Sequence, residues 1–112
     1  MPKFPIVWRN DDGELFYFEN EVEFEGCDSL GINGTELVDS DARFFRVFWH
    51  ERPRGNRIFR PTPDLYPTFR EISFRSTTEK LSVIDGMIHE TKQGTAEANF
   101  LSMQIHTVSE TW

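Results

Sequence analysis

The segment Ala42–His50, A-R-F-F-R-V-F-W-H, constrains the fold more than any other part of the chain. Side chains alternate between the two faces of a β-strand, so the apolar odd positions from Phe45 to Trp49 would share one face. Phe44 and Phe48 would occupy the opposite face. A strand that carries bulky apolar side chains on both faces must be covered on both sides. The sequence therefore predicts a central strand in a sheet with packing on each face.

The N-terminal quarter of the chain predicts a hairpin followed by more strand. Phe4–Arg9 and Glu14–Phe18 are β-type segments, and the turn Asn10–Gly13 between them contains Asp-Gly, which supplies positive φ angles readily. Residues 21–25, E-V-E-F-E, then alternate with a period of two. We expect them to continue the second strand, bulged near Asn20, with the apolar residues on one face and the three glutamates on the other.

Three more strands follow from similar patterns. A short strand at Glu36–Val38 leads into a turn at Asp39–Asp41, and later strands are expected at Phe69–Arg75 and Phe100–Val108. The glycine-rich residues 26–34 and the proline-rich residues 51–67 are expected to be loops, the second with a short edge strand at Arg57–Arg60.

Residues 76–93 fit two structures. Ser76 and Glu79 form a capping-box pattern, and apolar residues follow at helical spacing, with Gly94 as a cap. Asp85-Gly86 would instead turn a hairpin, and the glycine weakens a helix. We favour the helix. The fold class is then α+β: a mainly antiparallel sheet of five to seven strands with one helix near residues 77–92.

The length and composition predict one domain over residues 1–112. The chain has 11 Phe, 3 Trp and 2 Tyr among 112 residues, enough aromatic area for a real core. Its single cysteine, Cys27, cannot form an intrachain disulfide and suits a reducing compartment. The N-terminal apolar run is too short for a signal peptide, and no stretch reaches the ~20 apolar residues of a membrane span. We expect a cytoplasmic protein.

The net charge of −7 is distributed unevenly. Residues 11–42 contain eleven acids and no Lys or Arg, whereas residues 43–80 contain nine bases against four acids. Two interpretations remain open. Acidic and basic strands can neutralise each other inside the sheet. Alternatively, an unpaired acidic excess forms a face that attracts a basic partner.

We hypothesise that the chain is not an enzyme but a small acidic interaction protein that neutralises a basic partner such as a toxin or nuclease. Its profile is similar to that of small acidic immunity and antitoxin-type inhibitors: short, acidic and aromatic-rich, with no catalytic motif. Trp8 and Tyr17 are candidate apolar anchors. The expected partner-binding residues are Glu14, Glu19, Glu21, Glu23, Glu25, Asp28, Asp39 and Asp41.

Two alternatives stay open. One is a ligand-binding or enzymatic domain with a pocket between helix and sheet, lined by His50, His89 or His106. The other is nucleic-acid binding by a basic and aromatic loop, although the negative net charge opposes it. The residues of this loop are Arg52, Arg54, Arg57 and Arg60. No catalytic residue, metal site or cofactor is predicted.

Overall fold

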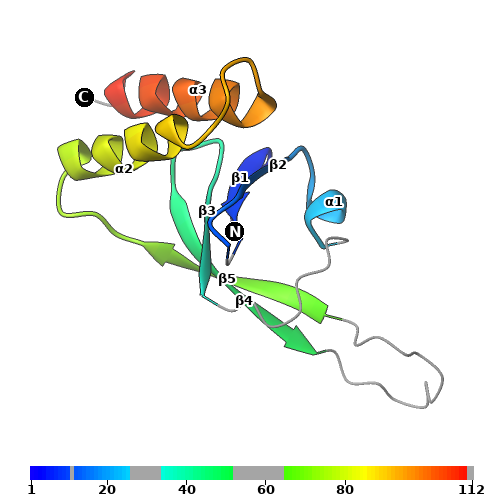
Figure 1. Ribbon diagram of the computed structural model, residues 1–112. Coiled ribbons are helices and arrows are strands. Elements are labelled where there is room, and N and C mark those ends of the chain that lie inside the picture. Colours follow the sequence, from blue (N-terminus) through cyan, green and yellow to red (C-terminus); the bar gives the residue numbers. More distant parts are fainter. Residues whose placement is uncertain (11, 26–33, 52–64, 111–112) are drawn as a thin grey trace, which may run out of the picture.

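The computed structural model describes residues 1–10, 12–25, 34–51 and 65–110. Its elements confirm an α+β fold, with three helices in place of the one predicted (Figure 1). The strands are β1 (Ile6–Arg9), β2 (Leu15–Phe18), β3 (Thr35–Val38), β4 (Phe44–Glu51) and β5 (Leu65–Ile72). The helices are α1 (Glu21–Glu25), α2 (Thr77–His89) and α3 (Ala96–Glu110).

The five strands form one antiparallel sheet in the order β2-β1-β3-β4-β5. The predicted hairpin is present, with Ile6 opposite Phe18 and Arg9 opposite Leu15. β4 lies between β3 and β5, which confirms the interior position that its two apolar faces predicted. β2 is at one edge of the sheet. This edge position leaves the outer side of β2 without a neighbouring strand among the described residues.

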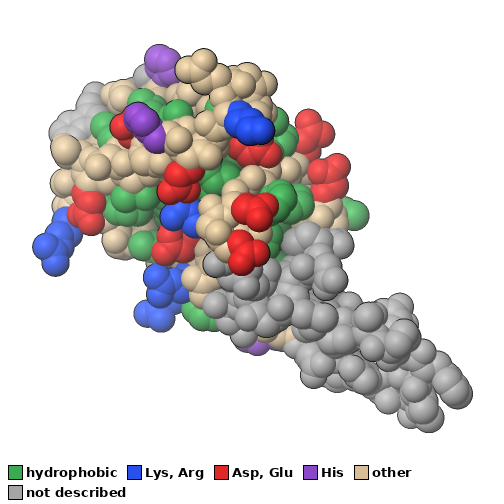
Figure 2. Space-filling model, viewed as in Figure 1, with side chains coloured by type: hydrophobic (Ala, Val, Ile, Leu, Met, Phe, Trp, Pro, Cys, Tyr) green, Lys and Arg blue, Asp and Glu red, His purple; other side chains and the backbone are tan. Residues whose placement is uncertain are grey.

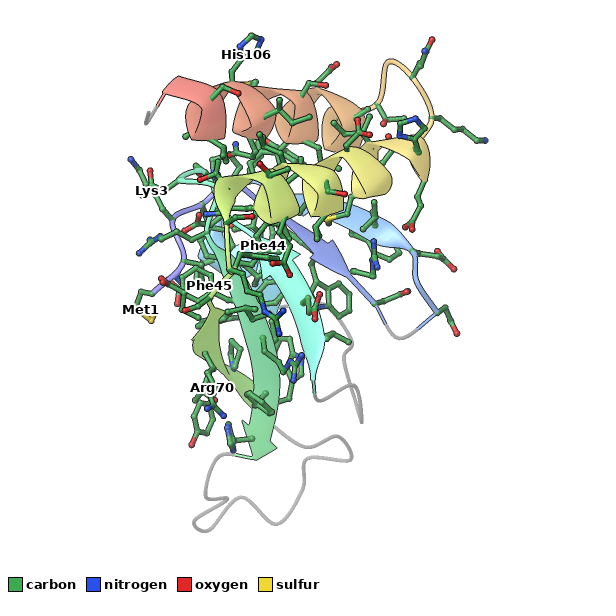
Figure 3. All side chains as sticks on the ribbon, turned by 90° about the vertical axis from the view of Figure 1, so that its left-hand side faces the viewer. Met1, Lys3, Phe44, Phe45, Arg70 and His106 are labelled. Atoms are coloured by element: carbon green, nitrogen blue, oxygen red, sulfur yellow. The ribbon has the colours of Figure 1, made fainter. Side chains whose placement is uncertain are left out.

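One face of the sheet is covered by α2 and α3, which lie side by side across it (Figure 1). Val38 and Phe44 pack there with Ile84 of α2 and Leu101 of α3, and Figure 3 shows Phe44 on the helix side of β4. These four side chains are almost completely buried. Burial of apolar area, at roughly 25 cal/mol per Å², is what attaches the helix pair to the sheet.

On the opposite face of the sheet, the buried side chains pack around Phe24 of α1. Phe24 is fully buried. Its ring centroid lies 5.3 Å from those of Phe18 and Trp49 and 6.0 Å from that of Trp8. The side chain of Asn20 caps the helix by accepting a hydrogen bond of 2.9 Å from the Glu23 amide. A helix of five residues is not stable alone, so Phe24 holds α1 on the sheet.

The prediction that residues 21–25 form a strand was wrong, because they form α1. A strand would have placed Val22 and Phe24 on the same face. In the helix they point in nearly opposite directions, and Val22 is 79% exposed while Phe24 is buried. The hydrogen bond from the Glu23 amide to Asn20 and the burial of Phe24 against the sheet favour the helix over the strand that the period-two pattern predicted.

The predicted strand at Phe100–Val108 was also wrong, because it lies within α3. Its alternating apolar residues include Met103, which is 65% exposed. Burial instead recurs at helical spacing, at Leu101, Gln104 and Val108. The hydroxyl of Thr95 accepts a hydrogen bond of 3.3 Å from the Ala98 amide and so caps the start of the helix.

The helix predicted near residues 77–92 is confirmed as α2. The hydroxyl of Ser76 accepts a 3.2 Å hydrogen bond from the Glu79 amide, as the capping box requires. The Glu79 carboxylate in turn accepts a hydrogen bond from the Arg75 amide at 3.3 Å. β5 begins at Leu65 rather than at Phe69. The loops predicted at 26–34 and 51–67, including the strand at Arg57–Arg60, fall mainly outside the described residues.

Candidate functional site

Part of the uneven charge is neutralised inside the fold. Glu36 of β3 lies directly opposite Arg46 of β4, and their side chains form an ion pair of 3.4 Å. Arg43 contacts three acids, the nearest being Asp39 at 3.0 Å. The first interpretation of the charge pattern, that of pairing between acidic and basic segments, therefore holds for residues 36–46.

Asp39 belongs to this internal network and is not at the surface. It is fully buried. Its carboxylate accepts hydrogen bonds from the backbone amides of Lys3 at 2.9 Å, Asp41 at 3.0 Å and Arg43 at 2.9 Å, and from Nε of Arg43 at 3.1 Å. These bonds close the turn before β4 and hold the N-terminal segment beside it. A carboxylate so enclosed has no face to offer a partner, so Asp39 leaves the set of predicted contact residues.

Asp41 is exposed, although it has two cations within reach. Its carboxylate lies 3.8 Å from Lys3 and 3.8 Å from Arg43. Asp28 lies outside the described residues. The predicted partner-binding set therefore divides into buried, internally paired and unpaired members.

The unpaired members gather where β2 leads into α1. We call Glu19, Glu21, Glu23 and Glu25 the acidic surface. Within the described ranges of the chain, none of these four carboxylates forms an ion pair with a Lys, Arg or His. Figure 2 shows acidic side chains on this side of the molecule. Glu14 lies at the other end of β2, roughly 16 Å from Glu19 at ~3.3 Å per strand residue. It also has no ion pair among the described residues.

Apolar side chains are exposed beside the acidic surface. Val22 projects from α1 between its glutamates, and Phe16 on β2 is 38% exposed. The outer edge of β2 lies between Glu14 and Glu19. Carboxylates around exposed apolar groups, next to a strand edge, are a surface suited to contact with another protein.

The two predicted aromatic anchors have different positions. Trp8 is 5% exposed, and its indole Nε1 donates a 2.9 Å hydrogen bond to the hydroxyl of Thr35, so it is a core residue. Tyr17 is half-buried on the α3 side of β2, and its ring meets that of Phe100 edge to face at 5.9 Å. Of the two, Tyr17 alone reaches the surface.

The three histidines lie on three different elements. His50 lies on β4, where Nε2 is 2.8 Å from the hydroxyl of Thr68, while His89 lies near the end of α2. His106 projects from α3 away from the sheet (Figure 3). Two surface grooves, one beside α3 and one at the start of α2, are lined by no histidine. Over the described residues, no group of three His, Cys, Asp or Glu side chains could hold a metal ion.

The arginine-rich loop with Arg52, Arg54, Arg57 and Arg60 lies outside the described residues, so nucleic-acid binding stays a prediction. No helix in the described part of the chain is long and apolar enough to cross a membrane. Comparison with protein families, curated proteins and solved structures found no match. Within the described part of the chain, fold and surface together form an α+β domain whose acidic surface has no ion pairs and lies beside the edge strand β2.

Proposed function

We propose that this protein binds a basic protein partner through the acidic surface and thereby inhibits it, as an immunity or antitoxin-type protein inhibits a toxin or nuclease. The observation that supports the proposal is selective pairing. The acids of residues 36–41 have cations beside them, whereas the four carboxylates of the acidic surface have none among the described residues.

Repulsion between the glutamates of α1 destabilises this helix when no partner is bound. Glu21 and Glu25 are four residues apart on a helix, and like charges at this spacing destabilise a helix by ~0.2–0.5 kcal/mol. A cationic partner would remove this repulsion. It would also be attracted from a distance, because a cluster of one sign raises association rates by about 10- to 1,000-fold at low salt.

The exposed apolar groups give the partner something to bury. Val22 lies within the acidic surface, and Phe16 lies on the adjacent strand. Charge pairs at the rim of an interface mainly accelerate association, whereas buried apolar contacts slow dissociation. We place this encounter in the cytoplasm, where Cys27 would stay reduced.

A matched pair of variants tests the proposal. E21K/E23K reverses two charges of the acidic surface, and D85K/E97K makes the same change in net charge on α2 and α3. Wild type and both variants, each checked for folding by circular dichroism, are immobilised and used to capture proteins from the source cells. Association rates of the captured protein are then measured between about 20 mM and 500 mM salt, which spans strong to weak screening.

The wild type and D85K/E97K should capture the same basic protein. E21K/E23K should associate about tenfold more slowly at low salt and should lose most of the salt dependence. Capture of no basic protein, or equal rates for the two variants, would show that the acidic surface is not the binding site.

A further inference from the structure

A groove runs between α3 and the edge strand β2, next to the acidic surface. It has a volume of about 440 Å³, within the range of pockets that hold small ligands or single side chains. Tyr17 and Glu19 form the β2 side, and Phe100, Met103 and Gln104 form the α3 side. Glu19 is part of both the groove and the acidic surface, so the two are continuous.

The lining of the groove combines apolar walls with one negative charge. The edge-to-face rings of Tyr17 and Phe100 and the side chain of Met103, which is 65% exposed, offer apolar contact. Glu19 is the one charged side chain among the described lining residues. Aromatic faces and a carboxylate both attract cations, and apolar walls accommodate a hydrocarbon stem.

Gln104 is the unusual member of this lining. It is only 3% exposed, and its Oε1 accepts no hydrogen bond from the described residues. A buried acceptor without a donor costs about 1–3 kcal/mol. Leucine would occupy the same helical position without this cost. A buried acceptor that finds no donor among the described residues indicates a role in binding something that brings its own donor.

We propose that the groove receives an arginine or lysine side chain of the basic partner, an inference that rests on the proposed function. The aliphatic stem of that side chain packs between Phe100 and Met103. Its cationic end lies against the aromatic rings and the Glu19 carboxylate. The terminal torsion of glutamine is soft, so rotation of the Gln104 amide brings its oxygen to the N–H groups of the cation.

The groove can be tested without the partner, with n-butylguanidinium as a probe that carries both stem and cation. The probe is titrated into the ¹⁵N-labelled protein, and amide shifts are followed by NMR. We expect saturable shifts in α3 and at Tyr17. E19Q should raise the dissociation constant about threefold. Q104L should raise it about tenfold, because hydrogen bonds to charged groups are the stronger ones. D85N, a matched neutralisation on α2, should leave it unchanged.

Each contrary result has a definite meaning. Equal shifts with n-butanol would show that the groove takes apolar stems without selecting a cation, and would overturn the proposal. Shifts confined to α1, or insensitivity to both E19Q and Q104L, would overturn it as well. Selective binding of the probe in the groove, together with unchanged partner capture by E21K/E23K, would instead leave the groove standing and remove the proposed role of α1.

Discussion

Replacement of Phe24 by alanine tests how the second face of the sheet is held together. Phe24 is the sole buried side chain of α1, and it lies in the middle of a ring of aromatic side chains. Rings within 6.2 Å of its centroid belong to Phe4, Trp8, Phe18, Trp49 and Phe69. F24A removes the contact with all of them and leaves a cavity where they meet.

The expected loss is large. Phe→Ala substitutions in cores cost about 3–5 kcal/mol, and aromatic pairs add roughly 0.5–1.5 kcal/mol each beyond burial of area. The measured Phe→Ala range already includes such pairs, so five aromatic neighbours place F24A near its upper end, at about 4–5 kcal/mol. A chain of 112 residues has a total stability of about 6–17 kcal/mol, so this one side chain supplies a quarter or more of it.

Urea unfolding followed by tryptophan fluorescence measures this loss directly. Trp8 and Trp49 both contact Phe24, so the probe reports on the site itself. With m about 1–3 kcal/mol per M, the midpoint should fall by about 2 M. V22A, on the same helix but at an exposed position, should change stability by less than about 0.5 kcal/mol. A loss below about 1.5 kcal/mol for F24A would refute the idea that this ring cluster organises the face.

Three further substitutions, the first with a matched control, test the other structural arguments by the same urea assay. D39N should destabilise the protein by about 2–3 kcal/mol, because it places an amide group among four N–H donors. The control D41N changes an exposed ion pair and should cost less than about 1 kcal/mol. Equal losses for the two variants would contradict the buried network. Q104L should stabilise the protein by about 1–3 kcal/mol, because it removes an unpaired buried acceptor. Destabilisation by this substitution would mean that the amide serves the fold. S76A should cost about 1 kcal/mol by removing the cap of α2, and no change would show that the bond to Glu79 contributes nothing.

Some elements could be predicted from the sequence, because the residues that form them carry the signal. The Asp-Gly turn located the first hairpin, and Ser76 with Glu79 located the start of α2. The two apolar faces of the segment from Phe44 to Trp49 gave an interior strand. In each case the signal comes from the residues of the element themselves, so no knowledge of distant neighbours was needed.

Two elements were misassigned for a common reason. The period-two pattern at 100–108 also places apolar residues at helical spacing, and the pattern at 21–25 contains only two apolar residues, Val22 and Phe24, too few to fix a period. Whether such a segment forms a strand or a helix depends on the surface against which it packs. Phe24 packs against a ring of aromatic side chains, and α3 packs against one face of the sheet. Such surfaces are assembled from strands far away in the chain, so the pattern alone could not decide.

The acidic segment of residues 11–42 was visible in the sequence, because charge is a property of residue type. The division of its carboxylates into paired and unpaired groups was not visible in the sequence. The register of β3 against β4 set Glu36 opposite Arg46, and the turn before β4 enclosed Asp39, while the cap of α1 left Glu21 and Glu23 facing outward. Sequence alone determined how much negative charge the chain carries; tertiary structure decided which carboxylates remain unpaired, because pairing depends on distances between segments that only folding brings together.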